Sequence, residues 1–248
     1  KPFIYTFAIA HLGYDPCTLV PNLPVTIETD NGTIWQPKEA GRVEYTGELK
    51  PLWWGLANSR NNYSAWIMKQ ARQPQAVADY IHKMGIKSYI DPVYSLCLGT
   101  PDFSLFELVG AYGTFANRGV FTDPIFVTRI EDRNGNVLAT FAPALQDAIS
   151  EQTAFTMLGM MKNVVTSGTA GRLRWMYGFK ADMAGKTGTT NNNSDGWFMG
   201  FTPSLVSGVW VGGEDRDIHF DTMQFGQGAS MALPIWAIYM NKVYADKS

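Results

Sequence analysis

The stretch that decides the fold is Ala184-Gly-Lys-Thr-Gly-Thr-Thr190, a strand-like segment of mostly small residues. Two further runs with strand character follow at once, Trp197–Thr202 and Leu205–Val211, and short polar turns separate the three. Neighbouring strands joined by short turns predict an antiparallel meander and exclude a purely parallel βαβ sheet. Small residues in a strand also mark a place where another backbone approaches closely. The first strand is therefore both the edge of a predicted sheet and a candidate contact site.

Helical patterns surround this meander on both sides. The expected helices cover the first eleven residues, Leu49 to Gln73, Pro74 to Met84, Leu105 to Asn117, Glu151 to Val165 after a capping Ser150, and Ala232 to Tyr244. Polar residues 58–62 interrupt the second of these helices, which marks a break in an otherwise apolar pattern. Asn134-Gly135, flanked by two alternating runs within Phe126–Phe141, predicts a β-hairpin. Residues 13–47 are expected to be mainly loop, with one short strand over Val25–Thr29.

The composition is that of a folded domain. The chain has 248 residues, of which 46% are apolar and 17% charged, and this excludes a disordered segment. A net charge of −2 gives no electrostatic reason to expect nucleic acid or an anionic membrane surface as a partner. The longest apolar run, residues 231–240, is too short to cross a bilayer, which needs about 20 residues.

Neither cysteine nor histidine usage predicts a metal site, and no cofactor is expected. Cys17 and Cys97 stand far apart without a second ligand pair nearby, and they are expected to be small buried residues, with a single disulfide as the alternative. His11, His82 and His219 are scattered and form no zinc-binding motif.

The residues with chemical potential lie in two polar segments. In the bare strand, Lys186 supplies a positive charge, and the hydroxyls of Thr187 and Thr189 are suited to binding a carboxylate. An edge strand can also pair with an extended peptide. In the polar break, Ser59 and Asn61 could face the same way if the backbone is locally extended. The rival interpretation of Gly185-Lys-Thr as the phosphate loop of a nucleotide-binding enzyme is disfavoured, because Lys180 stands where that motif needs glycine.

The order of Lys1, then Ser59-Arg-Asn61, then Lys186-Thr-Gly-Thr189 is the constellation of penicillin-binding proteins and related β-lactamases. The whole chain resembles the transpeptidase domain of class A, or bifunctional, penicillin-binding proteins, within the serine β-lactamase/DD-peptidase superfamily. The matching segments are Lys1–Tyr5, Leu56–Asn61, Gly99–Pro101, Glu107–Gly119, Val164–Thr169, Ala184–Thr190, Asp195–Gly200 and Val209–Gly212.

This resemblance implies an α/β fold of the α+β type over residues 1–248. We expect one antiparallel sheet with the strand of Lys186 at its open edge. The N-terminal helix and the final helix would flank this sheet, and an all-helical lobe would contribute Ser59 and Asn61.

The resemblance also implies a function, that of a peptidoglycan D,D-transpeptidase acting on stem peptides that end in D-Ala-D-Ala and binding β-lactams. Lys1 would be the general base, Ser59 would relay a proton, Asn61 would orient the substrate amide, and Lys186 would set the electrostatics. Thr187, Gly188 and Thr189 would bind the substrate.

In the family the nucleophilic serine stands three positions before the residue matched by Lys1. The chain is therefore expected to be a fragment that lacks this serine, a glycosyltransferase module and a membrane anchor, and to be unable to acylate by itself. The complete protein is expected at the periplasmic face of the bacterial inner membrane. A D,D-carboxypeptidase and a non-catalytic stem-peptide-binding module are the alternatives. A β-lactamase is disfavoured because the Glu-x-x-Asn segment from Glu131 to Asn134 ends in the predicted hairpin turn.

Overall fold

The predicted meander is a three-stranded antiparallel sheet in the computed structural model, which describes residues 1–29, 31–41 and 44–246. Its strands are β9 (Ala184–Thr189), β10 (Asp195–Phe201) and β11 (Val206–Gly212), in the order β11-β10-β9. Trp197 in the central strand lies opposite Gly188 on one side and Trp210 on the other. The strand that carries Lys186 is thus an edge strand of this sheet, as the sequence predicts.

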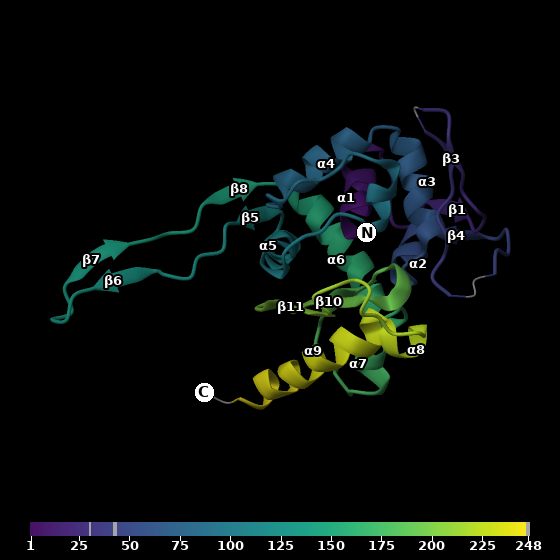
Figure 1. Ribbon diagram of the computed structural model, residues 1–248. Helices are drawn as coiled ribbons and strands as arrows, with labels where there is room; N and C mark the ends of the chain where they lie inside the picture. The colour runs from purple at the N-terminus through teal and green to yellow at the C-terminus, as the bar shows by residue number, and fades with distance from the viewer. Residues whose placement is uncertain (30, 42–43, 247–248) are drawn as a thin grey trace.

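Three helices cover the sheet. α6 (Glu151–Thr166) packs against β9, α9 (Gly228–Ala245) lies along β10 and β11, and α5 (Leu105–Ala116) packs on β11 (Figure 1). Fully buried Trp236 fixes α9 to the sheet, because its ring packs edge-on against Phe198 and its indole N–H donates to Ser207 Oγ at 2.7 Å. These helices form one continuous hydrophobic core with the sheet.

The N-terminal helix does not lie where the sequence analysis placed it. α1 (Pro2–His11) was expected on the sheet, yet it packs mainly against α3, α4 and α6. Seven of its ten residues are buried. A helix that is apolar on nearly every side belongs inside a bundle, so α1 forms the centre of the helical lobe rather than a cover for the sheet.

The helical lobe surrounds α1. Its further elements are α2 (Leu52–Ala57), α3 (Asn61–Ala71), α4 (Pro74–Lys83) and the 3₁₀ turn η1 (Tyr94–Leu98), and two short helices, α7 (Arg172–Trp175) and α8 (Met223–Gly226), lie beside the sheet. Small strand pairs brace the loops, namely β1 (Leu19–Pro21) with β4 (Leu49–Pro51), β2 (Ile27–Glu28) with β3 (Ile34–Trp35), and β5 (Val120–Thr122) with β8 (Leu145–Asp147). The strand predicted over Val25–Thr29 is thus only two residues long. Residues 30, 42 and 43 of the predicted loop lie outside the described residues.

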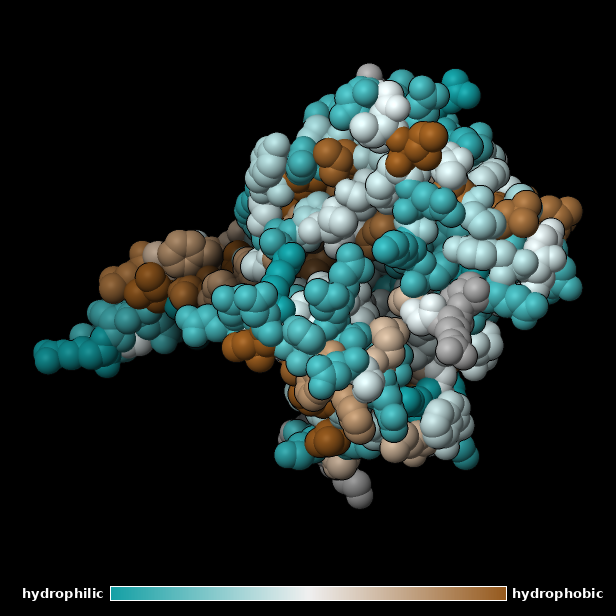
Figure 2. Space-filling model, turned by 45° about the vertical axis from the view of Figure 1, so that its right-hand side comes forward, coloured by the Kyte–Doolittle hydropathy of each residue, from teal (hydrophilic) through white to brown (hydrophobic). Residues whose placement is uncertain are grey.

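The predicted hairpin is present and forms a projecting arm. β6 (Arg129–Glu131) pairs with β7 (Val137–Thr140) far from the sheet (Figure 1). Residues 132–136 connect the two strands, so the connection is longer than a two-residue turn. Within it the Asp132 carboxylate accepts the N–H groups of Asn134 and Asn136, and Gly135 takes a φ of 85°. Figure 2 shows apolar side chains along this arm and a hydrophilic tip. The exposed apolar residues include Phe126, Ile130, Val137 and Leu138.

Both cysteines are free, so the disulfide alternative is wrong. Cys97 is buried, as expected, but Cys17 is exposed. Cys17 lies in a tight turn in which its N–H donates to the Asp15 carboxylate at 2.7 Å, and this turn holds it at the surface. Among the described residues, no helix has the length and apolar character needed to span a membrane.

The N-terminus of α5 has a complete capping box. The Ser104 hydroxyl accepts the N–H of Glu107, and the Glu107 carboxylate accepts the N–H of Ser104. The same carboxylate accepts the N–H groups of Lys87 and Ser88, which lie shortly after the end of α4. These bonds tie the segment that follows α4 to α5. Desolvation raises the pKa of Glu107, but these hydrogen bonds outweigh it and lower the pKa to about 2.

Replacing Glu107 by Gln is therefore expected to lower the free energy of unfolding by about 1–2 kcal/mol at neutral pH. Because the folded pKa lies below the unfolded value of about 4.3, this stabilisation is present above that value and is lost as pH falls toward the folded pKa of about 2. Urea denaturation of both proteins at several pH values tests this. Equal stabilities at neutral pH would contradict it.

Candidate active site

Ser59 lies in a strained turn between α2 and α3. Its φ is 54°, in the left-handed region that residues with a side chain rarely adopt. Two backbone bonds to the preceding helix hold the turn, from Ser59 N–H to Leu56 O and from Arg60 N–H to Gly55 O. Strain of this kind persists only where the surroundings enforce it, and it recurs at functional sites.

Lys186 reaches this turn from the edge strand of the sheet. Its side chain is only 4% exposed, and its ammonium donates to Ser59 Oγ at 2.8 Å and to the Thr187 carbonyl at 3.0 Å. The two residues are 127 positions apart in the sequence. This hydrogen bond therefore joins the sheet to the helical lobe and brings two of the predicted site residues together.

Lys1 is a second, half-buried amine whose charge acts on Lys186. It precedes α1, where Phe3, Leu96 and Cys97 line a small apolar hollow beside it. Burial lowers the pKa of Lys1, and the charge of Glu39 partly opposes that shift. Burial and the charge of Lys1 together hold the pKa of Lys186 well below its usual value. Two amines with lowered pKa values thus share one site.

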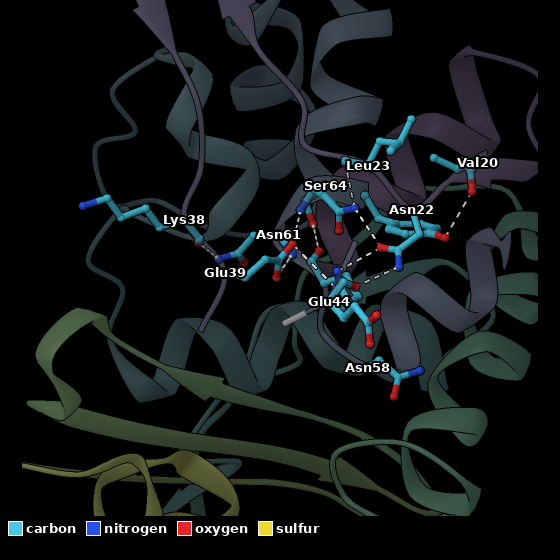
Figure 3. Close-up of polar contacts among 12 residues, drawn as sticks. Val20, Asn22, Leu23, Lys38, Glu39, Glu44, Asn58, Asn61 and Ser64 are labelled. Atoms are coloured by element: carbon cyan, nitrogen blue, oxygen red, sulfur yellow. Dashed lines mark hydrogen bonds and ion pairs between the residues drawn. The ribbon is translucent and has the colours of Figure 1, made fainter. Parts of the chain in front are cut away.

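Asn61 departs from the expected geometry. Of the three residues of this segment only Arg60 is extended, because Ser59 is left-handed and Asn61 is already the first residue of α3. The Asn61 side-chain amide donates to the Lys38 carbonyl at 2.6 Å (Figure 3). In this structure the amide contacts the neighbouring loop rather than a group of the Lys186–Ser59 pair.

The hydroxyls of Thr187 and Thr189 already have protein partners. Thr187 Oγ1 lies 2.6 Å from Thr169 Oγ1, and Thr189 Oγ1 accepts the N–H of Gly228 at 3.0 Å. The close approach predicted for the bare strand is also present, and the approaching backbone belongs to the start of α9. A Cβ on Gly228 would lie 2.1 Å from the carbonyl oxygen of Gly188, so no larger residue fits there.

Two residues with contacts at this site were not identified from the sequence as site residues. Thr169 ends the matching segment Val164–Thr169, to which no role was assigned from the sequence. The signal that could have identified it is its position directly after the expected helix. Glu39 carries no local signal, because it lies in the stretch interpreted as loop. Its carboxylate accepts the N–H groups of Asn61 and Asn62.

The phosphate-loop interpretation is wrong. Lys186 lies in the middle of a strand, whereas that motif needs a loop that opens a helix. The Glu131–Asn134 segment lies on the projecting arm formed by β6 and β7, away from β10 and β11 of the three-stranded sheet (Figure 1). Among residues 1–29, 31–41 and 44–246, no group of three or more His, Cys, Asp or Glu side chains could hold a metal ion.

Comparison with known proteins identifies the class. The family described as penicillin binding protein transpeptidase domain matches residues 1–217, and the chain belongs to this family. The chain is 33% identical over 243 residues to penicillin-binding protein 1A of Aquifex aeolicus, covering 98% of this chain and 32% of that protein. It is 34% identical over 249 residues to penicillin-binding protein 1A of Neisseria meningitidis, covering 97% and 30%. The chain thus spans about a third of the length of the curated relatives it matches.

Solved structures agree with this assignment. Penicillin-binding protein 1A from Haemophilus influenzae superposes with a TM-score of 0.85 at 24% identity, over 100% of this chain and 42% of that one. PonA1 from Mycobacterium tuberculosis in complex with penicillin V gives a TM-score of 0.77 at 25% identity, over 100% and 68%. The mixed fold of helices and antiparallel strands predicted from the sequence is confirmed.

The strain at Ser59 predicts an unusual order of stability for two variants. Ser59→Gly and Ser59→Ala both remove the hydroxyl that Lys186 contacts, but only glycine adopts the left-handed conformation without strain. Ser59→Gly is therefore expected to be more stable than Ser59→Ala by about 1 kcal/mol in urea denaturation. An alanine variant at least as stable as the glycine variant would show that the turn is not strained.

Proposed function

We propose that the complete protein is a peptidoglycan D,D-transpeptidase that cross-links stem peptides ending in D-Ala-D-Ala. The observation that carries this proposal is the buried Lys186–Ser59 hydrogen bond, with the lowered pKa of Lys1 beside it. Such a cluster of amine and hydroxyl groups is suited to moving a proton between a nucleophile and a leaving amine.

The nucleophile in this proposal is a serine three positions before Lys1, as in the family. Its hydroxyl attacks the carbonyl between the two D-alanines, and neutral Lys1 takes the proton. The tetrahedral intermediate collapses to an acyl-enzyme, and the proton passes through Ser59 to the amine of the departing D-alanine. The amine of a second stem peptide then attacks the ester, which closes the cross-link and restores the serine.

The sheet edge would bind the substrate. We assign Thr187 and Thr189 to the terminal carboxylate, with Gly188 leaving room for the peptide backbone. Thr169, at 2.6 Å from Thr187, would orient that hydroxyl toward the ligand. The N–H of Thr189 and that of the proposed serine would form the oxyanion hole, where one donor contributes about 10²–10³ in rate. Asn61 would hold the substrate amide after releasing the Lys38 carbonyl.

Binding of β-lactams is part of the same proposal. The strained amide and the carboxylate of a penicillin imitate the peptide terminus, so the same serine would be acylated. PonA1, one of the proteins of similar structure, has been solved in complex with penicillin V. The complete protein would act at the periplasmic face of the bacterial inner membrane, with an anchor and a glycosyltransferase module outside residues 1–248.

Replacing Lys186 by Ala in the full-length protein is expected to abolish covalent labelling by a fluorescent penicillin, because the proton relay and the positive charge are both lost. Lys162→Ala is the matched control, since Lys162 pairs with Asp182 at 2.6 Å on the surface of α6. Labelling is read on a denaturing gel at equal protein concentration. Full labelling of the Lys186 variant would refute its role, and an unlabelled parent would refute the proposed function.

The rate of labelling is also expected to depend on pH through Lys1. Only the neutral amine can accept the serine proton, and burial lowers the pKa of Lys1, so neutral amine is available below the ordinary lysine value of about 10.4. The rate should therefore persist below the pH at which an ordinary lysine is protonated, and fall as pH drops through the folded pKa of Lys1. This profile is measured by quenching the labelling reaction at set times at each pH. A rate that falls only above neutral pH would contradict the assignment of Lys1 as the general base.

A further inference from the structure

The helix that follows the Ser59 turn is capped by a residue from a distant loop. Its N-cap residue is Arg60, whose side chain has no acceptor and makes no capping bond. Glu39 supplies the cap instead, because its carboxylate accepts the N–H of Asn61 at 3.0 Å and that of Asn62 at 2.7 Å (Figure 3). Glu39 therefore holds the two residues that directly follow the strained turn.

This carboxylate is buried within a polar network. Its side chain is 7% exposed, and Arg60 Nε lies 3.6 Å from Oε1. Arg60 in turn donates to Asn22 Oδ1 at 2.9 Å, and Asn22 donates to the Glu44 carbonyl at 3.2 Å. The network thus fixes the loop around Glu39 on the same lobe that carries Ser59.

Glu39 is also an acidic group whose charge reaches the site. Its charge acts on Lys1, which itself acts on Lys186, and Arg60 adds a third cation from the turn. The other titratable groups here are Cys97 from η1, Tyr5 from α1, Tyr63 from α3, and Tyr45, over whose ring Arg60 lies. Burial raises the pKa of Cys97 to about 12, and the pKa values of the three tyrosines are also raised, so all four are neutral near pH 7. Glu39 is the remaining negative charge of the described cluster.

We propose that Glu39 is a positioning residue for the reaction, which clamps the turn of Ser59 against Lys186 and sets the charge that Lys1 experiences. The proposal rests on the proposed function. Both carboxylate oxygens accept backbone N–H groups, so Glu39 acts through Ser59 and Lys1 and does not itself contact the substrate. Glu39 lies outside the motifs on which the site was predicted from the sequence, so this role follows from its contacts in the structure.

A second role for this carboxylate has to be distinguished. A buried carboxylate beside a lysine could activate a water that hydrolyses the acyl-enzyme. Its two oxygens are already engaged by Asn61 and Asn62, which favours a clamp over a base. Measuring the loss of label as well as its formation separates the two roles.

The experiment uses the full-length protein and a fluorescent penicillin, with rates of labelling and of label loss measured from about pH 5 to about pH 9. Glu39→Ala is expected to lower the labelling rate by about tenfold to a hundredfold, because the turn is no longer held. Glu39→Gln keeps one acceptor oxygen, so its labelling rate is expected to fall less than that of Glu39→Ala. Glu39→Asp, which keeps the charge, should restore the parent pH profile.

The labelling rate falls at low pH, and the pH at which it falls, the acid limb of the profile, is the decisive readout. Loss of a purely structural cap would leave this pH unchanged. Removing the negative charge disfavours protonated Lys1, so the acid limb of Glu39→Gln should move to lower pH than that of the parent. The control is Glu107→Gln, which removes another carboxylate cap at α5 and should leave the limb in place. If Glu39→Ala does not fold, the profile of Glu39→Gln decides.

Three results would overturn the inference. The first is a labelling rate and a pH profile like those of the parent in both Glu39→Gln and Glu39→Ala. The second is a slower loss of label in Glu39→Gln with an unchanged rate of labelling, and the third is an equal shift of the acid limb in Glu39→Gln and Glu107→Gln. Failure of the parent itself to label would instead reject the proposed function.

Discussion

The hydrogen bond between Lys186 and Ser59 is the interaction on which the site depends. Each partner is unfavourable there by itself, since burial of an ammonium removes its hydration and a left-handed serine is strained. The bond itself contributes only about 1.5–3 kcal/mol as a bond to a charged group. It can persist because the sheet and the helical lobe are each rigid, and because their mutual placement is fixed by contacts elsewhere.

α6 supplies much of that placement. It packs against α1 and α2 in the lobe and against β9 in the sheet. The turn after α6 bonds to both sides, since the N–H of Thr169 donates to the Ala57 carbonyl and its hydroxyl contacts Thr187. A Cβ on Gly168 would lie 2.2 Å from that Ala57 oxygen. The turn can therefore approach α2 only because residue 168 is glycine, and the distance from sheet to Ser59 follows from this approach.

The parts of the structure predicted correctly from the sequence have local causes. The strand-forming residues of Trp197–Thr202 and Leu205–Val211, the short turns between them and the Asn134-Gly135 turn each act within a few residues. The meander and the hairpin were therefore predictable. The placement of α1, the partner of Asn61 and the cap by Glu39 depend on which segments meet in space. Motif order predicted the meeting of Lys186 with Ser59, but it could not indicate that a loop residue would satisfy the N–H groups that Arg60 leaves open.

The balance of charge at the site links its shape to its proposed ligand. The described cluster holds three basic side chains, Lys1, Lys186 and Arg60, and one carboxylate, Glu39. It therefore has unbalanced positive charge whenever the lysines are protonated. Burial offsets part of this imbalance by lowering both lysine pKa values, which favours the neutral amine that the proposed general base needs. A bound substrate carboxylate would supply the missing negative charge. Neutral ligands would lack this gain, so in the proposed reaction the same electrostatics would activate the amine and favour peptides with a free C-terminus.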